Sequence, residues 1–139
     1  MHSARPVAPH KGKVLIIDDD PIVLAMVRVL LEDAGYEVLV RESALGTLQL
    51  VREEQPDAVL LDVMMPALNG ERIATLLKNN ERTRNVRIIL HSSKPEDELA
   101  ALTEEAGAVG AISKGERPEK FLRRFEALMR RGAIDPRLR

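Results

Sequence analysis

Acidic, hydroxyl and ammonium side chains follow short apolar runs at several points in this sequence. Asp18 and Asp19 end the first run, Asp62 the third, Ser92 the fourth and Lys114 the fifth. Taken singly, each has an ordinary explanation as a turn former or a solvated charge. Taken together, carboxylates on two runs and a lysine on another exceed what turn formation requires. If the runs are parallel strands, these groups converge at one edge of a sheet.

The chemistry of such a cluster depends on its charge. Neighbouring carboxylates repel one another, which favours either protonation or a bound cation. Oxygen ligands, in a chain that contains no cysteine, indicate a hard ion such as Mg²⁺. One carboxylate could then attack a phosphoryl group while the metal and Lys114 offset the charge on the phosphoryl oxygens. Ser92 could donate a hydrogen bond to the same group.

The elements that must position these groups alternate along the chain. Apolar runs of strand length lack the polar alternation of a half-exposed sheet, and segments of helical period separate them, so the pattern predicts a parallel sheet covered by helices on both faces. The predicted strands are 14–17, 38–40, 58–61, 86–90 and 108–112. The predicted helices are 22–34, 44–54, 71–79, 95–106 and 119–131.

Local signals support these helix boundaries. Asp20 followed by Pro21 is typical of a helix start, and Gly35 is placed to end the first helix. Ser43 is expected to cap the second helix, and Pro118 to open the last one. Right-handed crossovers then give an open, doubly wound α/β sheet, with its ligand site at the carboxyl ends of the strands where the strand order reverses.

Composition limits the functional classes. The 139 residues suit one domain, with 45% hydrophobic residues, 31% charged residues and a net charge of −1, so no global charge draws the chain to nucleic acid or membrane. The lack of cysteine excludes disulfides and thiol catalysis and suits a reducing cytosol. Residues 1–12 are expected to be a flexible tail, 13–131 the folded domain and 132–139 a basic tail.

Four sequence runs carry a resemblance to a known family. VLIIDDDP, VLLDVMMPALNG, IILHSS and GAISKG resemble, in order and spacing, the motifs of response-regulator receiver domains of two-component signal transduction, the CheY-like superfamily. The resemblance covers roughly residues 13–131. It implies a flavodoxin-like fold with five parallel strands in the order 2-1-3-4-5.

The resemblance also assigns roles to individual residues. Asp62 would be the phosphoacceptor, and Mg²⁺ would be bound by Asp18, Asp19, Asp62 and the backbone carbonyl of Met64. Ser92 would be the switch hydroxyl, and Lys114 would pair with the phosphate.

The same resemblance implies partners and a cellular setting. The chain would be a cytoplasmic, single-domain response regulator that receives its phosphoryl group from a sensor histidine kinase or a phosphotransfer protein. It would catalyse only its own phosphorylation and dephosphorylation. Its output would pass to a downstream protein, or to a homodimer, through the face formed by the fourth and fifth helices and the strand between them. Direct binding to nucleic acid or membrane is not expected.

Three positions depart from the family pattern. Gly115 stands where a proline usually follows the lysine, Ala111 replaces an aromatic switch residue, and His91 replaces an apolar residue. We expect His91 to be a hydrogen-bonded structural histidine. These departures leave open a pseudo-receiver that binds a partner constitutively. An aspartate-nucleophile phosphohydrolase is a weaker alternative, because the Asp-x-Asp followed by Thr of such enzymes is absent: Pro21 follows Asp20.

Overall fold

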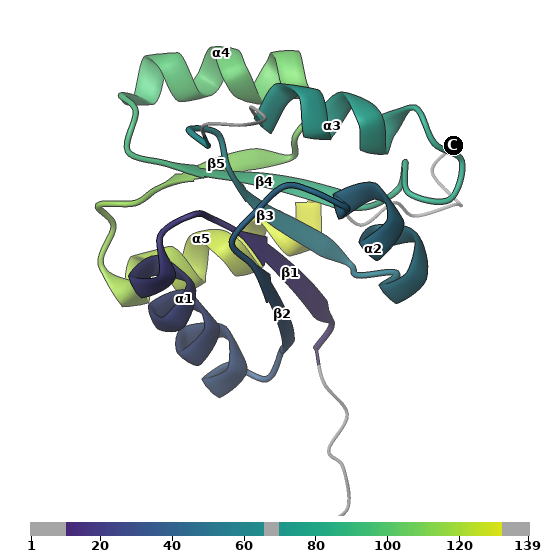
Figure 1. The fold of residues 1–139 in the computed structure, drawn as a ribbon. Helices are drawn as coiled ribbons and strands as arrows, with labels where there is room; N and C mark the ends of the chain where they lie inside the picture. The colour runs from purple at the N-terminus through teal and green to yellow at the C-terminus, as the bar shows by residue number, and fades with distance from the viewer. Residues whose placement is uncertain (1–10, 66–69, 132–139) are drawn as a thin grey trace, which may run out of the picture.

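A parallel five-stranded sheet forms the centre of the molecule (Figure 1). The computed structural model describes residues 11–65 and 70–131. The sheet order is β2-β1-β3-β4-β5, which confirms the predicted fold class and strand order. The strands are β1 (Lys13–Ile17), β2 (Glu37–Arg41), β3 (Ala58–Asp62), β4 (Arg87–Ser92) and β5 (Gly110–Ser113).

Helices cover both faces of this sheet (Figure 1). They are α1 (Pro21–Asp33), α2 (Thr47–Glu54), α3 (Gly70–Lys78), α4 (Glu96–Ala106) and α5 (Pro118–Arg131). Helices α1 and α5 pack on one face, and α2, α3 and α4 on the other. Within the described ranges, no helix has the length and hydropathy that crossing a bilayer would require.

The strand residues divide between two hydrophobic cores. Ile16 and Leu60 face α1 and α5, whereas Leu15 and Leu61 face the other three helices. All four are at most 1% exposed. Because both faces of the central strands are buried, these strands show no alternation of polar and apolar residues.

Helix α1 has the ends that the sequence predicts. The Asp20 carboxylate accepts a hydrogen bond from the Ile22 amide. At the other end, Gly35 has a φ of 105°, and the amides of Gly35 and Tyr36 donate to carbonyls of the last helical turn. This pattern is a Schellman motif, for which glycine is favoured because it adopts positive φ without steric cost.

Two predicted boundaries were wrong for local reasons. Helix α2 begins at Thr47 instead of residue 44, because Gly46 has a φ of 75° and Ser43 caps only the amide of Leu45. Strand β5 begins at Gly110 instead of residue 108, because the Ala108 amide donates to Thr103 and so completes the end of α4. The remaining boundaries agree to within two residues.

Lys11, which the sequence places in the N-terminal tail, contacts the folded domain. Its amide donates to the Gly35 carbonyl, and its ammonium lies 2.8 Å from the Glu126 carboxylate on α5. Glu126 also accepts the Tyr36 hydroxyl at 3.0 Å. Burial, together with this bond to Glu126, raises the pKa of Tyr36 to about 12. The rest of the predicted N-terminal tail, apart from Gly12, and the whole C-terminal tail lie outside the described residues.

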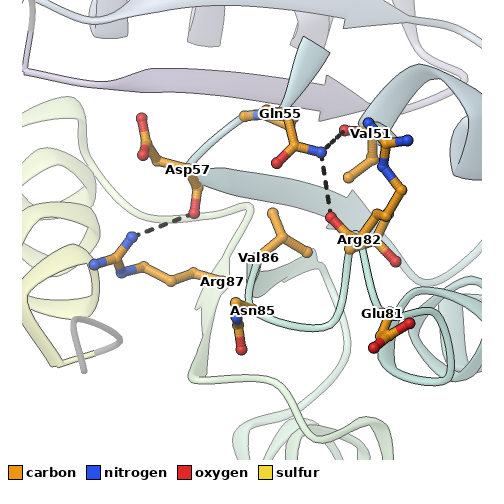
Figure 2. Close-up of a pocket in the computed structure, with 10 residues that line it drawn as sticks. Val51, Gln55, Asp57, Glu81, Arg82, Asn85, Val86 and Arg87 are labelled. Atoms are coloured by element: carbon orange, nitrogen blue, oxygen red, sulfur yellow. Dashed lines mark hydrogen bonds between the residues drawn. The ribbon is translucent and has the colours of Figure 1, made fainter. Parts of the chain in front are cut away.

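A polar pocket of about 390 Å³ (Figure 2) lies near the amino ends of β3 and β4. Asp62 and Ser92 end these strands at the opposite edge of the sheet. The polar groups of the pocket hold chain segments together. The Gln55 side-chain amide donates to the carbonyls of Val51 and Arg82, and the Arg87 guanidinium donates to the Asp57 carbonyl. We therefore interpret this pocket as structural.

His91 is buried in β4, on the face covered by α1 and α5. Its side chain is 5% exposed, and its ring meets that of Phe121 edge-on at a centroid distance of 5.4 Å. Burial and the nearby Lys114 ammonium lower the pKa of His91 to about 4, so the imidazole is neutral at pH 7. Among the described residues, Nδ1 has no hydrogen-bond partner. The prediction of a hydrogen-bonded histidine is thus wrong for this nitrogen.

Stability should fall as the pH is lowered from 7 to 5. The pKa of His91 is lower in the folded state than in the unfolded chain. Between about pH 6.5 and pH 4 the unfolded chain therefore binds a proton that the folded protein does not. Over this range the free energy of unfolding falls as the pH falls. At pH 5 the loss amounts to about 1–2 kcal/mol. Urea unfolding at pH 7 and pH 5 measures this loss of free energy of unfolding. His91→Leu should lose less than wild type by that amount, because leucine does not titrate. Equal losses in the two proteins would contradict the assignment.

Gly110 allows α5 to pack closely on β5. A Cβ atom at Gly110 would overlap the side chain of Leu128, which is 1% exposed. Gly110→Ala should therefore lower the free energy of unfolding by about 1–3 kcal/mol, the usual cost of overpacking. In a Leu128→Ala background, urea unfolding should show little further cost, because the overlapping atoms are gone. The same cost in both backgrounds would refute the steric explanation.

Candidate functional site

Three carboxylates meet at the carboxyl edge of the sheet. Asp18 and Asp19 follow β1, and Asp62 ends β3. The two strands are neighbours in the sheet, with Ile17 beside Leu61, so the residues after them are brought together. One carboxylate oxygen from each residue lies within 4.8 Å of those of the other two. Asp18 and Asp62 are buried, while Asp19 is exposed.

Backbone hydrogen bonds orient the two buried carboxylates. Asp18 Oδ1 accepts from the Asp20 amide, and Asp62 Oδ1 accepts from the Met64 amide, each at 2.9 Å. Both bonds span two residues, so they belong to the turn that follows each strand. They leave Oδ2 of each residue free to face Lys114.

Lys114 reaches both carboxylates from the loop after β5. Its Nζ lies 2.8 Å from Asp18 Oδ2 and 3.4 Å from Asp62 Oδ2. Its amide donates to the Ser92 carbonyl at 2.9 Å, which anchors the loop to β4. The Ser113 hydroxyl accepts from the Gly115 amide. The loop thus directs the lysine into the site although Gly115 replaces the usual proline.

Ser113 has no predicted role in the sequence pattern. The only available signal was a hydroxyl two residues before a glycine, which is typical of a Ser/Thr turn. That signal is common in loops and does not identify a functional site.

The electrostatics of the site favour an additional cation. Burial, with a contribution from the Asp18 charge, raises the pKa of Asp62. Burial alone would lower the pKa of Lys114, but the carboxylates of Asp18 and Asp62 outweigh it, so the net shift is upward. With all groups ionised, three carboxylates and one ammonium leave a formal charge of −2.

The donor set fits Mg²⁺. Asp18 Oδ2 is buried and lies 2.8 Å from Lys114 Nζ, and a carboxylate oxygen that faces one ammonium still has a lone pair for a cation. Hard carboxylate oxygens with a local excess of negative charge are what Mg²⁺ prefers. The Met64 carbonyl, predicted as a further ligand, belongs to the turn that orients Asp62.

Ser92 lies next to this cluster in β4. It follows His91, which pairs with Asp62 in the sheet register, and it is fully buried. Its hydroxyl oxygen accepts from the Lys94 amide at 3.1 Å, so the hydroxyl proton stays available for another acceptor. The predicted switch position therefore lies on β4, between β3, which ends at Asp62, and β5, which is followed by Lys114.

Known proteins share this arrangement of sequence and fold. Residues 14–126 match the model of the response regulator receiver domain. The phosphate regulon transcriptional regulatory protein PhoB of Pseudomonas aeruginosa is 35% identical over 118 residues, which cover 85% of this chain and 52% of PhoB. The DNA-binding response regulator MtrA of Mycobacterium tuberculosis is 31% identical over 126 residues, covering 91% of this chain and 54% of MtrA. This chain thus spans about half the length of these curated relatives.

A solved structure shows the same likeness in three dimensions. The chemotaxis response regulator CheY4 of Vibrio cholerae superimposes with a TM-score of 0.78 at 26% sequence identity, over 84% of this chain and 98% of CheY4. The family match, the relatives and the shared fold agree with one another. The chain belongs to the response-regulator receiver domains of two-component signal transduction.

Proposed function

We propose that this chain is a single-domain response regulator that accepts a phosphoryl group on Asp62 from a sensor histidine kinase or a phosphotransfer protein. The observation that carries the proposal is the convergence of Asp18, Asp62 and Lys114, with Lys114 Nζ within 3.4 Å of both carboxylates. A structural role alone would not require two buried like charges beside a lysine, because such burial is unfavourable.

The transfer follows from the chemistry of these groups. A carboxylate oxygen of Asp62 attacks the phosphorus of a phosphohistidine, the P–N bond breaks, and its electron pair returns to the donor imidazole. Lys114 offsets the charge on the phosphoryl oxygens. Asp18, Asp19, Asp62 and the Met64 carbonyl would hold Mg²⁺, which when bound neutralises charge on the phosphoryl group. Hydrolysis of the acyl phosphate later restores the carboxylate, so the chain acts only on itself.

The response to phosphorylation must involve more than Ser92. Receiver domains usually use a hydroxyl residue and an aromatic residue as switch side chains. Ala111 stands at the aromatic position and cannot swing inward, so Ser92 is the remaining switch side chain of the family pattern. One charge-assisted hydrogen bond contributes about 1.5–3 kcal/mol, whereas inverting a 1:99 equilibrium needs about 5.5 kcal/mol. Lys114, drawn from Asp18 toward the new phosphate, supplies the remaining bias. The result is a modest shift of the loop 93–98 and of α4.

The output surface in this proposal is the face formed by α4, β5 and α5. A groove of about 960 Å³ runs along it, with Leu99, Ala111 and Ile112 among the apolar residues and Lys94, Glu104 and Arg124 among the charged ones. Such a mixed groove suits a downstream protein or a second copy of the chain in the cytoplasm. DNA binding is named for MtrA, and we do not extend it to this receiver domain.

A pseudo-receiver that binds a partner constitutively is the second candidate. It is favoured by Ala111 and Gly115, two departures at positions that usually serve switching. The discriminating experiment is incubation with a small-molecule phosphodonor and Mg²⁺, followed by intact mass measurement. A pseudo-receiver would gain no phosphoryl group.

Asp62→Asn should abolish phosphoryl incorporation, because the amide is not a nucleophile for this transfer. Wild type should gain the mass of one phosphoryl group with acetyl phosphate and Mg²⁺, and little without Mg²⁺. Asp20→Asn is the matched control, since Asn caps a helix as well as Asp does and Asp20 lies outside the carboxylate cluster. Incorporation into Asp62→Asn at the wild-type rate would show the assignment to be wrong.

Lys114→Ala should still accept the phosphoryl group, slowly, but should couple it poorly to α4 and α5. The reason is that the ammonium links the β5 loop to the new charge, which reaches up to about −2. Amide hydrogen exchange with and without a phosphoryl mimic measures the coupling. Ser92→Ala, as a comparison, should weaken the response without eliminating it. A wild-type response in Lys114→Ala would refute the role of the lysine.

A further inference from the structure

Lys78 differs from the other lysines of the chain in its surroundings. The chain has six lysines, and all of them lie in the part that the structure describes. Five have a carboxylate oxygen between 2.8 and 3.6 Å from Nζ, namely Lys11, Lys13, Lys94, Lys114 and Lys120. Lys78 has no such carboxylate among the described residues. Its Nζ donates instead to the backbone carbonyl of Arg84 at 3.3 Å.

The fold places the stem of Lys78 at the junction of two helices. Lys78 is the last residue of α3 and is partly buried. Its Cε lies 3.7 Å from the point that a Cβ atom at Gly107, the residue that ends α4, would occupy. Helices α3 and α4 both cover the same face of the sheet (Figure 1). The bond to Arg84 is exposed, so the amine is within reach of small molecules in solution.

These surroundings favour the neutral amine at Lys78. Burial lowers the pKa of Lys78, and the Arg84 carbonyl carries no full charge that would stabilise the ammonium. Lys114 shows the opposite balance, because the nearby carboxylates outweigh burial there and raise the pKa. A lysine must be neutral to act as a nucleophile. The lysine without a carboxylate is therefore the one that the fold makes reactive.

We propose that Lys78 is a site of acylation by acyl phosphates. The neutral Nζ attacks the carbonyl carbon, and an N–C bond forms. The C–O bond to the phosphate breaks, its electron pair leaves with the phosphate, and the surplus proton of the amine passes to solvent. The amide product carries no charge, and its N–H can still donate to the Arg84 carbonyl. The reaction does not require that Asp62 accept a phosphoryl group.

The test is incubation of the whole chain with acetyl phosphate in the presence of EDTA, which removes Mg²⁺ and so suppresses transfer to Asp62. Peptide mass spectrometry over time gives the acetylation rate of each lysine. Lys78 should react about two- to fivefold faster than Lys120, the effect of one ion pair at a protein surface. Exposure alone predicts the reverse order, because the Lys120 side chain is 63% exposed.

Three comparisons assign the preference to the fold and to the ion pairs. In guanidinium chloride the lysines should react at similar rates, because the unfolded chain has neither burial nor fixed ion pairs. Glu116→Gln removes the carboxylate 3.6 Å from Lys120, so it should raise the rate at Lys120 and leave that at Lys78 unchanged. Asp62→Asn should be acetylated at Lys78 at the wild-type rate, which separates this proposal from the phosphorylation of Asp62.

Three results would each overturn the proposal. One is a faster rate at any other lysine of the folded protein. Another is a preference for Lys78 that persists in guanidinium chloride, since sequence and not fold would then be its cause. The third is an unchanged rate at Lys120 in Glu116→Gln, which would show that the carboxylates do not control the reactivity of these lysines.

Discussion

Two buried carboxylates beside one ammonium set the main constraint on this molecule. Asp18 follows β1, Asp62 ends the adjacent strand β3, and Lys114 approaches them to 2.8 Å and 3.4 Å from the loop after β5. Like charges removed from water repel strongly, and the single lysine offsets only part of that repulsion. The site is therefore ready to take up further positive charge, and it is sensitive to any group that changes the charge balance. Metal binding and phosphoryl transfer are both changes of this kind.

The loops at the edge of the sheet hold the two carboxylates and the lysine in fixed positions. Turn hydrogen bonds hold one oxygen of each buried carboxylate, and the β5 loop is tied to β4 through the bond between Lys114 and Ser92. Little reorganisation is then needed when charge arrives, which is the condition under which fixed charges stabilise a reacting group most effectively. The apolar strands behind the site are almost fully buried, and they keep this edge rigid.

Much of this arrangement could be predicted from the sequence, because its signals are local. Unbroken apolar runs indicated strands buried on both faces, and Asp20 and Gly35 marked the ends of α1. The strand order, by contrast, came from family resemblance, since periodicity does not say which strands are neighbours. The start of α2 was missed because nothing in the sequence indicates that Gly46 adopts a left-handed conformation. The unbonded Nδ1 of His91 could not be predicted, because it depends on tertiary packing such as the contact of its ring with Phe121 of α5.

The late position of α5 in the chain has a consequence for synthesis. Phe121, Phe125 and Leu128 complete the core that also contains Leu24 and Val27 of α1. A ribosome makes α1 before α5, so the part of α1 that packs against α5 stays uncovered until α5 has been translated. Until residue 131 has left the exit tunnel, the nascent domain exposes a surface of the kind that chaperones bind. The core on this face of the sheet is thus completed only after α5 has been made.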